Sequence, residues 1–165
     1  MSAIADFRLV ETSKLNELLQ VAEIKIEKKL FSKKTINNYP AYLDSCSKEL
    51  VNFQASGYVF ANLLVFLSEE KGIDILGSEY DEVANKISEH QQNSTIIITL
   101  AHKNLYFEML DRNKFTEEEL AQFNRDFSNE SFPELVQAEL EGIDALQKAL
   151  GFLNDDKHII LLSVG

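Results

Sequence analysis

The stretch that most constrains the fold is the apolar run His158–Val164, which reads His-Ile-Ile-Leu-Leu-Ser-Val. Successive side chains of a strand point to opposite faces of its sheet, so a strand that is apolar at consecutive positions presents apolar surface on both. Such a strand needs both faces, or at least one, covered by other elements. The run therefore predicts a strand of a packed sheet, entered from a turn at residues 154–157.

Two other segments have the composition of strands. Residues 4–10 place Phe7 and Leu9 on one face, and residues 95–100 are rich in β-branched side chains. The three predicted strands come from the start, middle and end of the chain, without strict strand–helix–strand alternation. We therefore predict an α+β fold, in which a small sheet including the N- and C-terminal strands packs against several helices.

Helical spacing of apolar residues dominates the segments between these strands. It predicts a helix over residues 15–26, although the alternating residues 24–27 leave its end uncertain. The lysine-rich residues 28–34 lead into a polar loop. Pro40 suits a first helical turn, and a further helix is predicted to carry an apolar stripe formed by Leu43, Cys46, Leu50 and Phe53.

The run at residues 58–67 is apolar on nearly every side. It predicts a buried central helix that ends with Gly72 in the left-handed position after the last turn. A buried strand is the alternative interpretation of the same run. Ser78 opens the next helix, which continues to Ile87.

Two N-terminal capping sequences mark helices in the last third of the chain. The sequence Thr116-Glu117-Glu118-Glu119 is a full capping box, and Ser131-Phe132-Pro133-Glu134 is a second one. The second helix runs through Leu150, with Gly151 as a natural C-cap. Residues 101–110 fit either a strand or a helix.

The chain is predicted to form a single domain, 1–165, because its 2 prolines and 6 glycines make no linker. A cytoplasmic location is expected for three reasons. Cys46 is the one cysteine, so no internal disulfide can form. The first residues lack the charged and apolar regions of a secretory leader. No apolar run approaches the roughly 20 residues that span a bilayer.

The net charge of −11 argues against nucleic acid and anionic membranes as partners, since both attract basic proteins. The charge is unevenly distributed. Residues 1–40 carry 7 basic and 5 acidic side chains, whereas residues 108–156 carry 4 basic and 13 acidic ones. The basic segment at residues 28–34 could still contact an anion locally. The acidic C-terminal helices could attract a basic partner, although solubility alone explains such a charge too.

The sequence contains no signature of a common catalytic or cofactor site. Its glycines form no phosphate-binding loop, and the nucleophile elbow of serine hydrolases is missing. Cys46 lies in an apolar stripe, which predicts a small buried core residue. His90, His102 and His158 lack the spacing of metal ligands. We therefore expect no cofactor and no metal, and we favour a protein that is not an enzyme.

The two ends of the chain resemble the YfbM-like family of uncharacterised bacterial proteins. The similar pieces are the opening strand and helix, Ile4-Ala5-Asp6-Phe7-Arg8-Leu9-Val10 through Lys14-Leu15-Asn16-Glu17-Leu18-Leu19, and the closing Lys157-His158-Ile159-Ile160-Leu161-Leu162-Ser163-Val164-Gly165. They cover about a third of the chain. The resemblance implies an α+β fold and supplies no catalytic residue, because the function of that family is itself unknown.

The sequence favours a non-enzymatic protein-binding module, similar in kind to an immunity protein or antitoxin, which engages a basic protein partner. Its contact residues are predicted on the acidic C-terminal helices: Glu117, Glu118, Asp126, Glu130 and Glu139. The alternative is a small-molecule-binding protein or an enzyme of unrecognised type. Its cleft would be lined by His102 with Tyr39, Tyr42, Tyr58, Tyr80 and Tyr106. A third hypothesis is a homo-oligomer whose exposed apolar surface is its own interface.

Overall fold

The structure is a computed structural model that describes residues 4–29 and 32–165. For residues 28, 29 and 32 it describes the backbone and not the side chains. Residues 1–3 and the middle of the lysine-rich segment 28–34 lie outside the described residues. The elements in chain order are β1 (Ala5–Glu11), the short 3-10 helix η1 (Thr12–Lys14), α1 (Leu15–Ala22), β2 (Lys25–Lys29), β3 (Ser32–Ile36), α2 (Tyr39–Cys46), β4 (Ser47–Asn52), α3 (Val59–Lys71), α4 (Asp81–Gln91), β5 (Ser94–Ile98), α5 (Leu100–Tyr106), η2 (Arg112–Lys114), α6 (Glu117–Ser128), α7 (Pro133–Gly151) and β6 (His158–Val164).

Four of the strands form one antiparallel sheet with the order β4-β1-β6-β5. The N-terminal strand β1 and the C-terminal strand β6 occupy its centre and pair along their whole length, from Ala5 opposite Val164 to Glu11 opposite His158. The predicted α+β fold, with both terminal strands in a small sheet, is confirmed. The strand predicted at residues 95–100 is present as β5, which starts one residue earlier and ends two residues earlier, because Leu100 begins α5.

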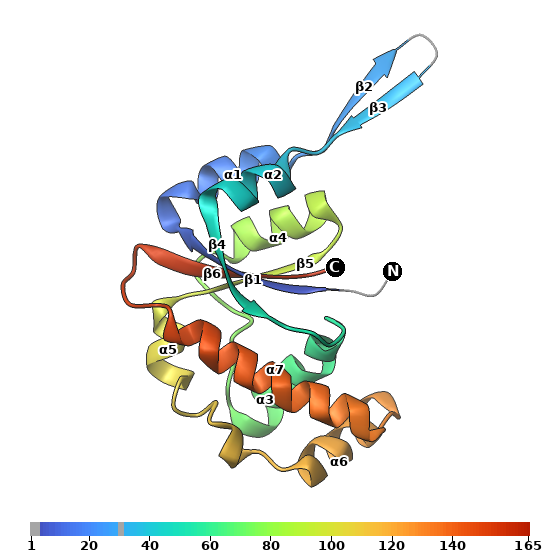
Figure 1. Ribbon diagram of the computed structural model, residues 1–165, viewed down its shortest axis with the longest axis vertical. Helices are drawn as coiled ribbons and strands as arrows, with labels where there is room; N and C mark the ends of the chain where they lie inside the picture. The colour runs from blue at the N-terminus through green and yellow to red at the C-terminus, as the bar shows by residue number, and fades with distance from the viewer. Residues whose placement is uncertain (1–3, 30–31) are drawn as a thin grey trace.

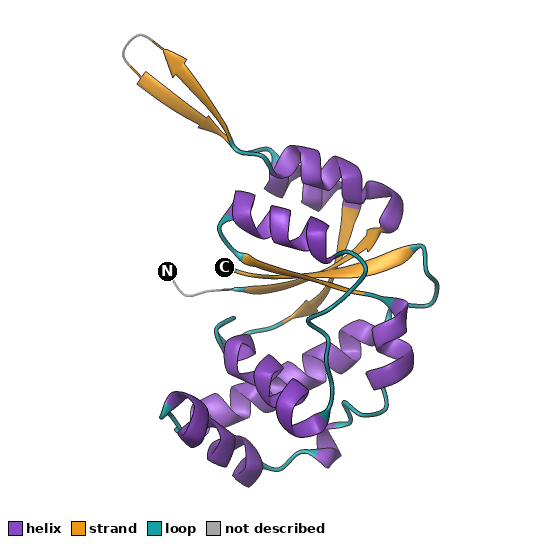
Figure 2. Ribbon diagram, turned by 180° about the vertical axis from the view of Figure 1, so that it is seen from behind, coloured by secondary structure: helices purple, strands orange, loops and turns teal. Residues whose placement is uncertain are grey.

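Helices cover both faces of this sheet, as Figures 1 and 2 show. On one face α1, α2 and α4 pack against Val10, Ile159 and Leu161. On the other face α3 and α7 pack against Phe7, Ile160 and Leu162, among others. Alternate residues of β6 thus enter two different cores, which explains why this strand is apolar at consecutive positions.

The run at residues 58–67 forms the helix α3, and the strand interpretation is wrong. One broad side of this helix is buried, formed by Val59, Phe60, Leu63, Leu64, Phe66 and Leu67. On the other side Ala61 is exposed and Val65 is half-buried. Helix α7 packs directly on it, because Gly142 leaves no side chain at the contact. A Cβ atom at position 142 would lie 2.7 Å from the Leu63 Cδ2 atom. A larger residue at this position would have to displace the buried Leu63 side chain, so glycine favours the observed approach of the two helices.

Two helices end earlier than their apolar stripes predict. Helix α1 ends at Ala22 and not at Ile26, which instead belongs to β2. Helix α2 ends at Cys46, and Ser47–Asn52 becomes β4. A strand here forms hydrogen bonds with the backbone groups along the free edge of β1. It also buries Leu50 on the face that α7 covers. Pairing with the sheet therefore overrides the helical spacing.

The helix termini agree with the sequence in part. Gly72 adopts the left-handed conformation with φ 64°, and the capping box at Thr116 forms, so both predictions are confirmed. The second capping box is wrong, because α7 begins at Pro133 with Phe132 as an N-cap that makes no side-chain hydrogen bond. Gly151 is the last helical residue and Phe152 is the C-cap. Residues 101–110 begin as helix α5 and continue as a turn.

Strands β2 and β3 form a separate two-stranded hairpin, where the sequence predicted the end of a helix and a loop. It projects from the α1 and α2 end of the molecule (Figures 1 and 2). Its register pairs Ile26 with Thr35 and Glu27 with Lys34. The alternation of apolar and charged residues at positions 24–27, which left the end of the helix open, is the signal for this hairpin.

Candidate acidic groove between helices α3 and α6

Helices α3 and α6 run side by side in opposite directions below the sheet. The amide of Asn62, early in α3, donates a hydrogen bond of 3.0 Å to the Ser128 hydroxyl at the end of α6. Lys71, at the end of α3, donates one of 2.8 Å to Glu119 at the start of α6. Glu119 also closes the capping box with Thr116, so the start of α6 is fixed both within its own turn and to α3.

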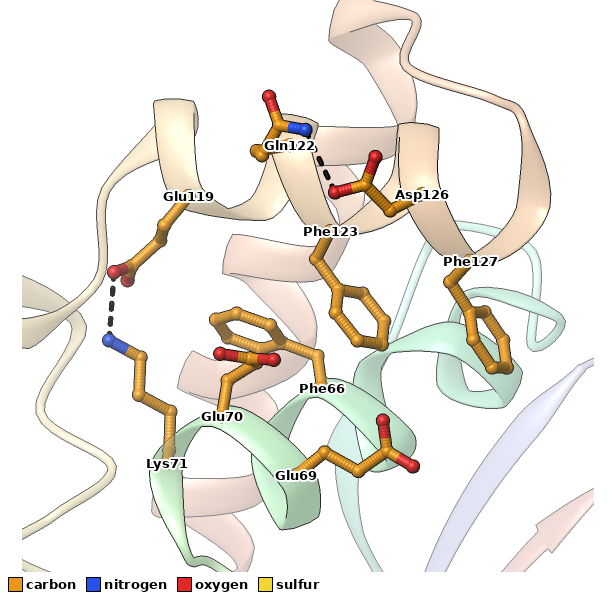
Figure 3. Close-up of a pocket in the computed structure, with 9 residues that line it drawn as sticks. All are labelled: Phe66, Glu69, Glu70, Lys71, Glu119, Gln122, Phe123, Asp126 and Phe127. Carbon is orange, nitrogen blue, oxygen red and sulfur yellow. Dashed lines mark hydrogen bonds and ion pairs between the residues drawn. The ribbon is translucent and has the colours of Figure 1, made fainter.

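An open groove with a volume of about 600 Å³ lies between the two helices (Figure 3). We call it the acidic groove and define it by its lining residues: Phe66, Glu69, Glu70, Lys71, Glu119, Gln122, Phe123, Asp126 and Phe127. Four of these nine side chains are carboxylates and one is an ammonium, so the lining carries a net of three negative charges. The volume falls in the range of roughly 300–1,000 Å³ typical of ligand sites.

The positive charge of Lys71 is already used inside the groove. Its ammonium group pairs with Glu119 and lies over the rings of Phe66 and Phe115, at 5.7 and 5.2 Å from their centroids. Glu69, Glu70 and Asp126 are exposed and have no cation as a partner among the described residues. Asp126 accepts a hydrogen bond of 2.8 Å from Gln122, which fixes one of its oxygens. The groove therefore keeps three uncompensated carboxylates at its rim.

The floor and one wall of the groove are aromatic. Phe66 is buried and meets Phe123 edge to face at 5.4 Å between ring centroids. Phe123 in turn stacks on Phe127 at 5.2 Å, and Phe127 remains 51% exposed. Aromatic rings beside carboxylates can receive the aliphatic stem and the charged head of a Lys or Arg side chain together.

A buried polar network fixes α6 and α7 beneath this region. Asn124 is fully buried and donates a hydrogen bond of 2.7 Å to one carboxyl oxygen of Glu139. The other oxygen, Oε1, has no partner among the described residues. Burial raises the pKa of Glu139 to about 7, although the hydrogen bond from Asn124 acts in the opposite direction. Asn62 bonds Asn124 as well, so the network links α3, α6 and α7.

The structure separates the five residues that the sequence predicted as partner contacts. Asp126 lies in the acidic groove. Glu117 and Glu118 are exposed on the first turn of α6, outside the groove, where Glu117 accepts a hydrogen bond from Gln137. Glu130 lines a neighbouring hollow. Glu139 is fully buried, so its prediction as a surface contact is wrong. Glu139 lies on the packed side of α7, where Asn124 donates a hydrogen bond to its carboxyl group.

Sequence reasoning missed the contribution of α3 to this site. Glu69 and Glu70 lie in the last turn of α3, and nothing in their neighbourhood in the sequence links them to α6. The burial of Glu139 did have a signal, because it lies four residues from both Leu135 and Ile143 on the apolar stripe of α7. Likewise Phe123 and Phe127 are four residues apart, the spacing that lets two rings meet on one helix face.

The tyrosines of the alternative hypothesis do not gather in one cleft. Tyr39, the first residue of α2, is buried in the core, while Tyr42, Tyr80 and Tyr58 line three different hollows. His102 is buried as well. Its Nδ1 atom accepts a hydrogen bond from the Thr99 amide, so Nε2 carries the hydrogen and donates it to the Gly77 carbonyl at 2.9 Å. The ring thus holds two backbone segments together.

Cys46 lies half-buried at a second hollow of about 560 Å³, which Tyr42 and His158 also line. The prediction that it is a buried core residue is therefore only partly right. Burial raises the pKa of its thiol, which disfavours the thiolate that a nucleophile needs. Nδ1 of His158 lies 2.7 Å from Asp155 Oδ1, and Tyr42 donates to Glu17. These partners hold both side chains in local contacts.

Within the part of the chain that the structure describes, no group of three or more His, Cys, Asp or Glu side chains is placed to hold a metal ion. No helix within residues 4–29 and 32–165 combines the length and the apolar character that crossing a bilayer requires.

Comparison with protein-family models found no match, and comparisons with curated proteins and with solved structures found no significant similarity. The resemblance to the YfbM-like family stays a prediction. The function is therefore argued from the geometry of the acidic groove.

Proposed function

We propose that this protein is a cytoplasmic protein-binding module that takes a basic segment of a protein partner into the acidic groove. The observation that carries the proposal is the combination of three uncompensated carboxylates with a half-exposed stacked phenylalanine in one concave surface. Aromatic side chains in a partly enclosed site provide the apolar contact, and the carboxylates select the sign of the partner's charge.

The surroundings of the groove support a macromolecular partner. Next to it, a hollow of about 520 Å³ is lined by the exposed aromatics Tyr58 and Phe132 together with Glu130 and Glu134. Protein interfaces are enriched in such aromatic side chains. The acidic field of residues 108–156 extends beyond both hollows and would accelerate the approach of a basic protein. Neutralisation of a basic toxin, as by an immunity protein or antitoxin, is the role we propose.

The test is calorimetric titration with a hexalysine peptide as the probe of a basic segment. The groove variant Glu69→Lys/Asp126→Lys reverses two rim charges, and Glu49→Lys/Glu89→Lys makes the same change in net charge on exposed positions of β4 and α4. We expect the groove variant to lose binding by on the order of tenfold or more, because like charges then face the peptide. The control is expected to lose much less. Equal losses in both variants would show that only the overall charge matters.

A further inference from the structure

The hairpin of β2 and β3 is a basic element on an acidic protein. Residues 25–36 contain five lysines and one glutamate, a net charge of +4, which leaves −15 on the rest of the chain. Within the described residues, its strands pair with one another and with no strand of the main sheet. A two-stranded hairpin alone is at best marginally stable in water, because it buries little apolar surface.

The hairpin is exposed along most of its described residues. Glu27 pairs with Lys34, and the described positions 33–35 of β3 are all exposed. The hairpin also exposes an apolar side chain, since Ile26 is 61% exposed. Its positive charge and its exposed apolar side chain therefore suit a surface that is acidic and partly apolar.

The acidic groove has this composition, with a net of three negative charges and a half-exposed Phe127. The hairpin and α6 lie at opposite ends of the long axis of the molecule (Figures 1 and 2). A hairpin can therefore reach a groove only on another copy of the chain.

We propose that the hairpin of one copy docks on the acidic groove of a second copy, and that two such contacts form a dimer with two-fold symmetry. When two copies lie side by side in opposite directions, each hairpin reaches the end of its partner that carries α6, so both contacts form at once and the assembly closes. This inference rests on the proposed function, because it names a second copy as one source of the basic segment. A partner protein then competes with the hairpin for the groove.

The experiment is sedimentation equilibrium of the full chain at micromolar concentration. The wild-type protein is expected to be a dimer at low salt and to dissociate as salt is raised, because exposed charges are screened. The hairpin variant Lys33→Glu/Lys34→Glu and the groove variant Glu69→Lys/Asp126→Lys are each expected to weaken dimerisation by on the order of tenfold or more. The control Lys86→Glu/Lys157→Glu changes the net charge as the hairpin variant does, at exposed positions on α4 and before β6, and is expected to dimerise.

Mixing the two reversed variants gives the sharpest outcome. In the mixed pair an acidic hairpin faces a basic groove, and a basic hairpin faces an acidic groove, so a heterodimer is expected although neither variant pairs with itself. A mixture that stays monomeric overturns the proposed contact. A wild-type chain that is monomeric at low salt overturns it as well.

The outcome for the proposed function is read separately, on the hairpin variant, whose groove is free. Binding of hexalysine by this variant together with a monomeric wild-type chain leaves the proposed function standing and rejects self-association. Failure of the peptide to bind rejects the proposed function itself, whatever the mass of the wild-type chain.

Discussion

At one end of the molecule, α3, α6 and α7 share a core and a buried polar network, and at the other end β2 and β3 contact chiefly one another. The first region is acidic and its surface is preorganised, because the side chains of the groove are held by packing, a capping box and an ion pair. The second region is basic and lacks a core of its own. The comparison teaches that a groove can be complete before a partner arrives, whereas an isolated hairpin depends on what it meets.

The largest expected difference between the two regions is in stability. Replacing the buried ring in Phe66→Ala leaves a cavity between α3 and α6, so we expect the free energy of unfolding to fall by about 3–5 kcal/mol. In the hairpin, Ile26→Ala removes an exposed side chain and is expected to change it by less than about 0.5 kcal/mol. Urea denaturation of both variants checks the contrast. An Ile26→Ala protein as destabilised as the Phe66→Ala protein would contradict the comparison.

A smaller effect is expected from pH, and it belongs to the helical end alone. The pKa of Glu139 is raised by burial from 4.5 to about 7, so between these values the folded chain binds a proton that the unfolded chain has released. The stability contributed by protonated Glu139 is therefore complete below about pH 4.5 and declines until about pH 7.

The variant Glu139→Gln keeps an acceptor for Asn124 and removes the titration. We expect the difference in unfolding free energy between wild type and variant to change by on the order of 2–3 kcal/mol from pH 4.5 to 7.5, with the wild type losing stability as pH rises. Thermal unfolding across this range measures it. A difference that stays constant with pH would show that Glu139 is ionised in the folded protein.

Helix capping gives the smallest of these effects. Thr116 accepts a hydrogen bond from the Glu119 amide at the start of α6, so Thr116→Ala is expected to lower the free energy of unfolding by about 1 kcal/mol. Ser131 precedes α7 and makes no capping bond there, so Ser131→Ala is a matched control with an expected effect below about 0.5 kcal/mol. Chemical denaturation measures both free energies of unfolding. Equal decreases in the two variants would contradict the observed caps.

The parts of the fold that the sequence predicted are those in which local pattern and tertiary environment agree. The run His158–Val164 is apolar on both faces because it lies between two cores. Helix α3 has a broad apolar side because it packs against the sheet and α7. The errors occur where the local pattern and the tertiary environment disagree. The stripe through Leu43 and Leu50 fits a helix, but the edge of β1 offers backbone partners that a helix cannot use.

Of the candidate site, only the acidic character could be predicted from the sequence. Asp126 lies in the groove as the acidic C-terminal segment indicated, whereas Glu69 and Glu70 come from a helix about fifty residues earlier in the chain. No local pattern can bring these segments together, since their contact depends on how α3 and α6 pack. Charge counting also could not tell the solvated Glu118 from the buried Glu139.

The most direct test of the acidic groove as the binding surface is a two-dimensional amide NMR titration of the hairpin variant Lys33→Glu/Lys34→Glu with hexalysine. The account predicts that the largest shift changes fall on residues 66–71 and 119–127, and that they vanish when Glu69→Lys/Asp126→Lys is added. Changes of similar size spread over all acidic surfaces, or centred away from α3 and α6, would contradict it.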